Sequence, residues 1–186
     1  MTQHVTVLYG DLDRILITGQ EIKDAVERLG AQITRDYQGK SPVMICILKG
    51  AVVFFSDLIR NIDLPVSLDF MAISSYGSST KTSGVVRILK DLDHDVAGRD
   101  VIVVEDIVDS GLTLSYITSL LDQRAARSVK IATLLDKPER RRTPLVVDYC
   151  CFTIPNEFVV GYGLDYNEKY RNLPDVGVLS PRMYSE

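Results

Sequence analysis

The sequence predicts an α/β protein with a mainly parallel sheet flanked by helices. Apolar, β-branched runs alternate along the chain with segments of helical spacing, and this alternation is typical of βαβ units. The clearest run, 101–104, reads Val-Ile-Val-Val and predicts a strand buried on both faces. A helix is expected after it, because four apolar residues fall on one helical face: Leu114, Ile117, Leu120 and Leu121.

The other elements follow in order from the N-terminus. A capping box formed by Thr18 and Glu21 begins a helix that ends near Gly39. The apolar face of this helix consists of Ile22, Val26, Leu29 and Ile33. The later segments predict strand 43–48, helix 51–60, strand 66–76, antiparallel strand 85–89, strand 129–135, strand 145–151 and strand 158–162. The tail from Leu164 is expected to be mostly irregular.

The segment 77–84 lies between two predicted strands. Its residues are all small or polar apart from Lys81, so it has no apolar surface to bury. We therefore expect a mobile loop at this place.

Length and composition indicate a single domain that spans residues 1–186. Of the residues, 46% are hydrophobic and 25% are charged, which is ordinary for a soluble globular protein. The net charge of −4 and the pI of about 5.2 argue against a nucleic-acid-binding role. The most apolar stretch, 43–59, is interrupted by Lys49 and Asp57 and is short for a membrane span. No signal-peptide pattern is seen at the N-terminus.

The cysteines and histidines limit the possible chemistry. Cys46, Cys150 and Cys151 have neither disulfide nor metal spacing, and we expect buried packing residues in a reducing cytoplasm. His4 and His94 lie far apart in the chain, which argues against a histidine metal site or a Ser-His-Asp triad.

An acidic stretch separates the central predicted strand from its helix. It contains Glu105, Asp106, Asp109, Ser110, Gly111 and Thr113. Free N–H groups at a helix N-terminus bind anions, a glycine lets a phosphate approach the backbone, and hydroxyls add donors. Carboxylates would repel a phosphate alone, but they accept hydrogen bonds from sugar hydroxyls and bind Mg²⁺. The stretch therefore predicts a site for a phosphorylated sugar and a metal. The alternative is an ordinary loop with solvated acids and Ser110 as the helix cap.

The order of residues in this stretch resembles the phosphoribosyl-pyrophosphate (PRPP) motif of the type I phosphoribosyltransferases, in the form of the hypoxanthine-guanine branch. Segment 158–171 is similar to the C-terminal signature of the same branch. The likeness covers nearly the whole chain, from about Asp11 to Ser180. One departure is Leu112, where the family often has a basic residue. This change keeps the backbone phosphate site and removes one possible charge from it.

The resemblance implies a role for each matching residue. Those expected to bind PRPP and its phosphate are Glu105, Asp106, Asp109, Ser110, Gly111, Leu112 and Thr113. Those expected to bind pyrophosphate are Lys49, Gly50 and Arg171. Those expected to bind the purine are Ile107, Lys137, Phe158, Val159 and Asp165. Mg²⁺ would be held by Glu105, Asp106 and Asp165.

Three further expectations concern single segments. Asp109 is expected to be catalytic and to handle the proton of the purine. Ser75 and Tyr76 are expected to begin a flap that closes over the site, opposite a small C-terminal hood. The basic run 140–142 is expected to be a solvated face.

The implied activity is the transfer of a phosphoribosyl group from PRPP to hypoxanthine or guanine. A homo-oligomer, either a dimer or a tetramer, would carry it out in the cytoplasm. Two alternatives stay open. One is a xanthine-preferring transferase, and the other is an RNA-binding regulator on the same fold, which the acidic pI disfavours.

Overall fold

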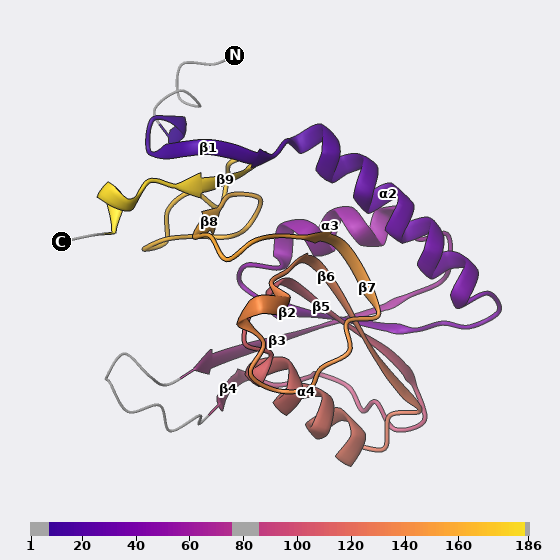
Figure 1. The fold of residues 1–186 in the computed structure, drawn as a ribbon. Coiled ribbons are helices and arrows are strands. Elements are labelled where there is room, and N and C mark those ends of the chain that lie inside the picture. The colour runs from indigo at the N-terminus through magenta and orange to yellow at the C-terminus, as the bar shows by residue number, and fades with distance from the viewer. Residues whose placement is uncertain (1–7, 76–85, 185–186) are drawn as a thin grey trace.

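The structure is a computed structural model that describes residues 8–75 and 86–184. Its main sheet has six strands in the order β4-β3-β2-β5-β6-β7 (Figure 1). The strands are β2 (Val43–Leu48), β3 (Ser67–Ser75), β4 (Val86–Lys90), β5 (Asp100–Val108), β6 (Ser128–Asp136) and β7 (Tyr149–Thr153). All neighbours pair in parallel except β3 and β4, which are antiparallel. The predicted mainly parallel sheet is confirmed.

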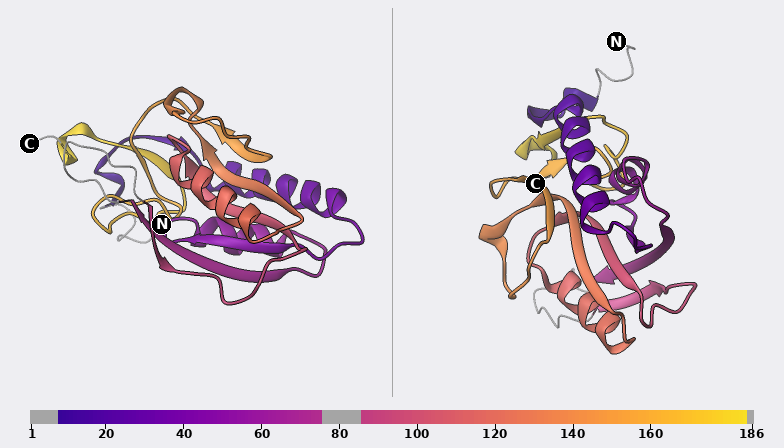
Figure 2. Two further views of the ribbon diagram at one scale, coloured as in Figure 1. Left: turned by 90° about the horizontal axis from the view of Figure 1, so that it is seen from below. Right: turned by 90° about the vertical axis from the view of Figure 1, so that its right-hand side faces the viewer.

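Helices cover both faces of this sheet. Helices α2 (Gly19–Asp36) and α3 (Val52–Arg60) lie on one face and α4 (Leu112–Gln123) on the other (Figures 1 and 2). Along β2, Met44 and Cys46 pack in the α2–α3 cluster, whereas Val43 and Ile45 pack in the α4 cluster. This alternation follows from the two-residue period of a strand and explains why the run is apolar throughout.

The first long helix begins as its sequence predicts. The Glu21 N–H donates to the Thr18 hydroxyl at 3.3 Å, and the Glu21 carboxylate accepts from the Thr18 N–H at 2.8 Å. These two bonds satisfy backbone donors that a helix start leaves free. The predicted apolar face, Ile22, Val26, Leu29 and Ile33, is fully buried.

A second, smaller sheet forms the hood and draws on both ends of the chain. It contains β1 (Leu12–Ile17), β9 (Val176–Leu179) and β8 (Val159–Val160), in the order β1-β9-β8 (Figure 1). The expectation of a mostly irregular tail is therefore wrong for β9. A strand of four residues that includes Gly177 has too weak a period to be seen in the sequence. Its partner β1 lies at the other end of the chain.

Two further strand predictions need correction. β5 continues through Glu105 and Asp106, so these acids lie on the strand and only 109–111 form the loop. β7 begins at Tyr149 instead of residue 145. Before it, the Asp148 carboxylate accepts from the Ile131 N–H at 2.9 Å and so takes the place of a strand partner.

The prediction that all three cysteines are buried is correct only for Cys46. Cys46 is buried, but Cys151 is half-buried and Cys150 is exposed on the edge strand β7. An edge strand has a neighbour on one side only, so part of its side chains reach solvent. Among the helices of the described residues, none is long and apolar enough to cross a membrane. The expected flap loop 77–84 and Tyr76 lie outside the described residues, and β3 ends at Ser75.

Candidate functional site

The predicted site residues meet at the carboxyl ends of the parallel strands. Lys49 follows β2, Asp109 follows β5 and Lys137 follows β6. In an open α/β sheet these ends form the crevice where ligands bind. The hood lies against this edge, since a Cβ added to Gly163 would be 2.1 Å from the Gly50 carbonyl oxygen. The fold therefore brings together motifs that are more than a hundred residues apart.

A small pocket of about 100 Å³ lies where β5 turns into α4. It is lined by Glu105, Ile107, Val108, Asp109, Ser110, Gly111, Thr113 and Leu114. Gly111 is the N-cap of α4 and has a φ of 79°, a left-handed conformation that favours glycine. The first N–H groups of α4 are thus available to an anion. Leu112 is not among the residues that line this pocket, and its side chain is 47% exposed.

Glu105 and Asp106 are adjacent on β5 and therefore point to opposite faces of the strand. The Glu105 Oε2 atom is buried and has no hydrogen-bond partner among the described residues. Burial, together with the nearby Asp106 carboxylate, raises the pKa of Glu105 well above its ordinary value. A buried acceptor without a partner is costly, so a ligand hydroxyl that donates to it would be favoured.

Asp106 faces the Gly50 loop. Its Oδ1 accepts from the Ile107 N–H at 2.7 Å, and a Cβ added to Gly50 would lie 1.7 Å from its Oδ2. Burial raises the pKa of Asp106 to about 6, and the positive charge of Arg171 opposes this shift. The negative charge of Asp165 also raises the Asp106 pKa, which places both acids in one electrostatic site.

Arg171 connects the hood to this pair of acids. Its guanidinium lies 2.8 Å from Asp165 Oδ1, and its Nη1 donates to the Gly163 carbonyl at 2.8 Å. The Nε atom is buried and has no partner among the described residues. Lys49 is more exposed, and its Nζ donates to Glu168 at 3.2 Å. An unpaired guanidinium donor beside a glycine loop is suited to phosphate oxygens.

The three expected metal ligands do not form one cluster. Within residues 8–75 and 86–184, no group of three His, Cys, Asp or Glu side chains is placed to hold a metal ion. The physical reason is that Glu105 and Asp106 leave the strand in opposite directions. Asp106 and Asp165 still fit Mg²⁺, because this ion is usually bound through one or two carboxylates together with substrate phosphates.

A second pocket, of about 470 Å³, contains all five residues expected to bind the purine. Ile107, Lys137, Phe158, Val159 and Asp165 line it together with Asp109. Lys137 is only 8% exposed, its Nζ donates to the Glu157 carbonyl at 2.6 Å, and burial lowers its pKa. Phe158 is 42% exposed and offers an open ring surface to a flat ligand.

The same pocket includes five residues that the sequence did not single out: Arg140, Asn156, Glu157, Leu164 and Tyr184. Tyr184 lies almost at the end of the chain, and its ring centroid is 5.1 Å from that of Phe158. Nothing in the sequence near Tyr184 indicates this contact. It depends on β9, which carries the tail back between β1 and β8 (Figure 1).

The basic run 140–142 is only partly a solvated face: Arg140 and Arg142 are exposed, but Arg141 is half-buried, and Arg140 and Arg141 both bind the Asp109 loop. Arg140 Nε donates to Asp109 Oδ1 at 2.9 Å, and Arg141 Nη1 donates to the Asp109 carbonyl at 3.2 Å. Arg141 also pairs with Asp136 at the end of β6. The turn at Pro138 brings these arginines back over the β5 loop, so they hold the loop that carries Asp109. The sequence signal for this role was that Arg140 and Arg141 come three and four residues after Lys137, which lies at the same edge of the sheet.

The arrangement defines a protein that binds an anionic sugar and a flat base side by side. The sequence model of the phosphoribosyl transferase domain matches residues 14–167. The chain belongs to the phosphoribosyltransferase family. It is 52% identical to a hypoxanthine-guanine phosphoribosyltransferase of Streptococcus thermophilus, over 97% of this chain and 100% of the relative.

Solved structures support the same family assignment. A hypoxanthine phosphoribosyltransferase from Staphylococcus aureus has a TM-score of 0.94 and 49% identity, and the match covers 97% of this chain and 98% of the other. One from Trypanosoma cruzi, studied for the role of its C-terminal region in oligomeric state and activity, has a TM-score of 0.90 and 41% identity. That match covers 95% of each chain.

Proposed function

We infer that this protein is a hypoxanthine-guanine phosphoribosyltransferase. It joins hypoxanthine or guanine to the ribose of PRPP and releases pyrophosphate, as in purine salvage. One observation carries this assignment: the α4 phosphate pocket and the pocket of Lys137 and Phe158 share Ile107 and Asp109 as lining residues. A sugar phosphate in the first pocket and a base in the second would therefore meet at Asp109.

In the reaction, a purine ring nitrogen bonds to the ribose C1 and the bond from C1 to the pyrophosphate oxygen breaks. The electron pair leaves with pyrophosphate, and the purine releases a proton. Positive charge develops on the ribose as the bond breaks, as in glycoside hydrolysis. At the carboxyl end of β5, Glu105 from one face of the strand and Asp106 from the other each accept a hydrogen bond from one of the two ribose hydroxyls. The α4 N-terminus binds the 5-phosphate.

On the leaving-group side, the Gly50 backbone and Arg171 bind pyrophosphate. On the base side, Lys137 donates to the O6 oxygen of the purine, Phe158 stacks on the ring, and Asp109 receives the proton. Asp106 and Asp165 would hold Mg²⁺, and the bound ion would supply positive charge to the pyrophosphate oxygens.

One assay panel tests the assignment. Hypoxanthine, guanine, xanthine, adenine and uracil are each supplied with PRPP and Mg²⁺, and nucleotide formation is followed. We expect turnover with hypoxanthine and guanine. A strong preference for xanthine, or salt-sensitive retention on an RNA filter without any turnover, would contradict the assignment. Neither alternative is supported by the relatives, which are hypoxanthine-guanine enzymes.

Removal of the metal is expected to abolish activity. Excess chelator should stop turnover, and added Mg²⁺ should restore it, because the positive charges of Lys49 and Arg171 alone leave much of the pyrophosphate charge uncompensated. The measurement is the initial rate at saturating PRPP, and Ca²⁺ serves as a control for a divalent ion of different geometry. Full turnover in a metal-free assay would contradict the proposed role of the metal.

Lys137→Ala is expected to lower kcat/KM for hypoxanthine and guanine by about ten- to a hundredfold, because the purine O6 loses its charged donor. The Kd of PRPP, measured by calorimetry, should hardly change. Lys130→Ala is the matched control, since Lys130 lies on β6, the strand that Lys137 follows, and pairs with Asp148 at 2.8 Å. An equal loss of PRPP affinity in Lys137→Ala would place this lysine in the phosphate site instead.

We further propose that residues 1–186 act as one catalytic domain in the cytoplasm and assemble into a homo-oligomer, a dimer or a tetramer. The pairing of β1 with β9 supports the single domain, because it ties both ends of the chain into one hood. Light scattering of the purified protein would give the oligomeric state.

A further inference from the structure

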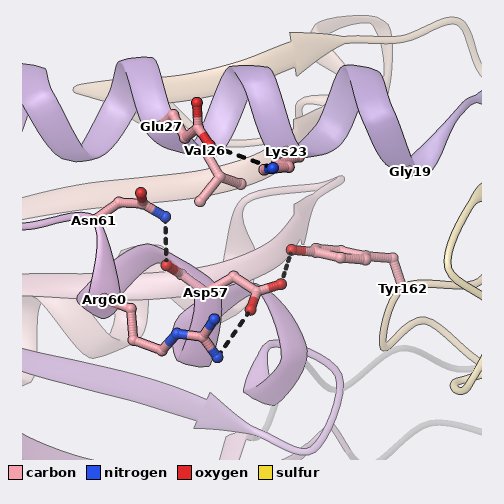
Figure 3. A pocket seen from close by; sticks show the side chains of 8 residues that line it. All are labelled: Gly19, Lys23, Val26, Glu27, Asp57, Arg60, Asn61 and Tyr162. Atoms are coloured by element: carbon pink, nitrogen blue, oxygen red, sulfur yellow. Dashed lines mark hydrogen bonds and ion pairs between the residues drawn. The ribbon is translucent and has the colours of Figure 1, made fainter.

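Tyr162 joins the hood to helix α3. It is 8% exposed and has a φ of 50°, between Gly161 and Gly163 with φ values of 101° and 102°. A non-glycine residue in the left-handed region is uncommon and needs support from its surroundings. The Tyr162 hydroxyl supplies this support, since it donates to Asp57 Oδ2 at 2.6 Å (Figure 3). Burial and the Asp57 carboxylate raise the pKa of Tyr162, so its hydroxyl stays a donor.

The next residue along this turn, Gly163, touches both groups on the pyrophosphate side. Its Cα packs so closely on the Gly50 carbonyl that an added Cβ would lie 2.1 Å from the oxygen. Its N–H donates to the Arg171 carbonyl at 2.9 Å, and its own carbonyl accepts from Arg171 Nη1 at 2.8 Å. The position of Gly163 therefore sets the separation between the Gly50 loop and the Arg171 guanidinium.

Asp57 is tied to the same loop from the other side. It lies on α3, which follows the Gly50 loop directly, and the Val52 N–H donates to the Lys49 carbonyl at 3.2 Å. The Tyr162–Asp57 bond thus closes a ring of contacts that runs from Gly50 through α3 and the hood turn back to Gly50. Breaking the bond removes one of the contacts that hold the hood turn against α3.

We propose that Tyr162 and Asp57 are positioning residues, which hold the Gly50 loop and Arg171 at the separation that pyrophosphate requires. Neither side chain is placed to touch the substrates. Their effect should fall mainly on PRPP and pyrophosphate, because Gly163 contacts Gly50 and Arg171 directly, whereas Lys137 on the base side follows β6. This inference rests on the proposed function, since it assigns pyrophosphate to the site of Gly50 and Arg171.

The Asp57 side chain borders a cleft of about 340 Å³ between α2 and α3 (Figure 3). Arg60 lies on the same helix, 3.9 Å from the second Asp57 oxygen, and is 75% exposed at its side chain. Asp57 itself is 41% exposed at its side chain. Substitutions of Asp57 are therefore compatible with the fold, whereas Tyr162 is in the interior.

The test compares variants in steady-state kinetics and in thermal unfolding. Tyr162→Phe removes only the hydroxyl, and we expect the KM for PRPP and the Kd for pyrophosphate to rise by about tenfold. The KM for hypoxanthine should rise less than the KM for PRPP. Asp57→Ala breaks the same hydrogen bond at its exposed partner and should raise both constants equally. It therefore tests the inference even if Tyr162→Phe folds poorly. Asp57→Asn keeps an acceptor oxygen and should restore most of the PRPP affinity.

Tyr149→Phe is the matched control. Tyr149 is 6% exposed, and its hydroxyl donates to Asp36 at 2.9 Å, between β7 and the end of α2. This variant loses a bond of the same kind, and its Tm should fall while its KM for PRPP stays at the wild-type value.

If Tyr162→Phe and Asp57→Ala lower the Tm but leave the KM for PRPP and the Kd for pyrophosphate unchanged, the pair is merely structural and the inference is wrong. A wild-type protein without transferase activity would instead contradict the proposed function, while pyrophosphate binding by calorimetry would still test the pair.

Discussion

Replacement of Asp109 by asparagine is expected to lower kcat by about 10²–10⁴-fold, the usual cost of removing a general base. Asparagine keeps the shape of the side chain, and its Oδ1 can still accept from Arg140, as Asp109 does at 2.9 Å. The chemical loss is therefore separated from a loss of packing. The Kd of PRPP and the Tm should change only slightly.

The location of Asp109 is the physical reason for this expectation. It lines both the pocket at the start of α4 and the pocket of Lys137 and Phe158, so under the proposed function it would lie where the new bond from C1 to nitrogen forms. The purine has to lose a proton at that point. A carboxylate within hydrogen-bond reach can accept this proton in the transition state, whereas an amide cannot.

Two measurements distinguish the chemical role from a role in binding. The effect of Asp109→Asn should shrink for a purine analogue that is already anionic at the assay pH, because its proton is gone. Arg140→Ala, which removes the partner of Asp109, should cost less than Asp109→Asn. If Asp109→Asn abolished PRPP binding while single-turnover chemistry stayed fast, Asp109 would belong to the ribose and phosphate site.

Elements that are buried on both sides were the most predictable from the sequence. Strand 43–48 agrees with β2 at both ends, because five of its six residues are buried and a continuous apolar run marks such a strand. The hood was not predictable in this way. β8 has two residues and β9 four, and the pairing of β9 with β1 depends on a partner far away in sequence.

The site was predictable to the extent that its residues lie in contiguous motifs. The loops after β2, β5 and β6 were identified because each combines a strand end with glycine or charged residues. Tyr184 was missed because its role comes from a returning tail that no local pattern encodes. Arg140 was missed although it lies only three residues after Lys137, because the run 140–142 was interpreted as a solvated face. The direction of Glu105 relative to Asp106 was also missed, because these acids were expected on a loop, where the strand alternation does not apply.

Gly50→Ala is expected to lower PRPP affinity by at least about 10²-fold, the cost that a displacement of roughly 1 Å can have in an active site. The added Cβ would lie 1.7 Å from Asp106 Oδ2, so the carboxyl group must rotate away. Rotation breaks the 2.7 Å bond from the Ile107 N–H and moves a buried acid out of the place where a ribose hydroxyl would reach it.

The clash of Gly50→Ala is with the end of a side chain and not with backbone, so the variant should fold and the loss should fall on binding. Gly39→Ala is the control, since Gly39 has a φ of 76° but no atom within 4 Å of an added Cβ. It should lower the Tm through backbone strain and leave PRPP binding intact. The measurements are the Kd of PRPP by calorimetry and the Tm by scanning calorimetry. A folded Gly50→Ala protein with wild-type PRPP affinity would show that the Asp106 carboxyl can move without consequence, and Asp106 would then have no part in holding the ribose.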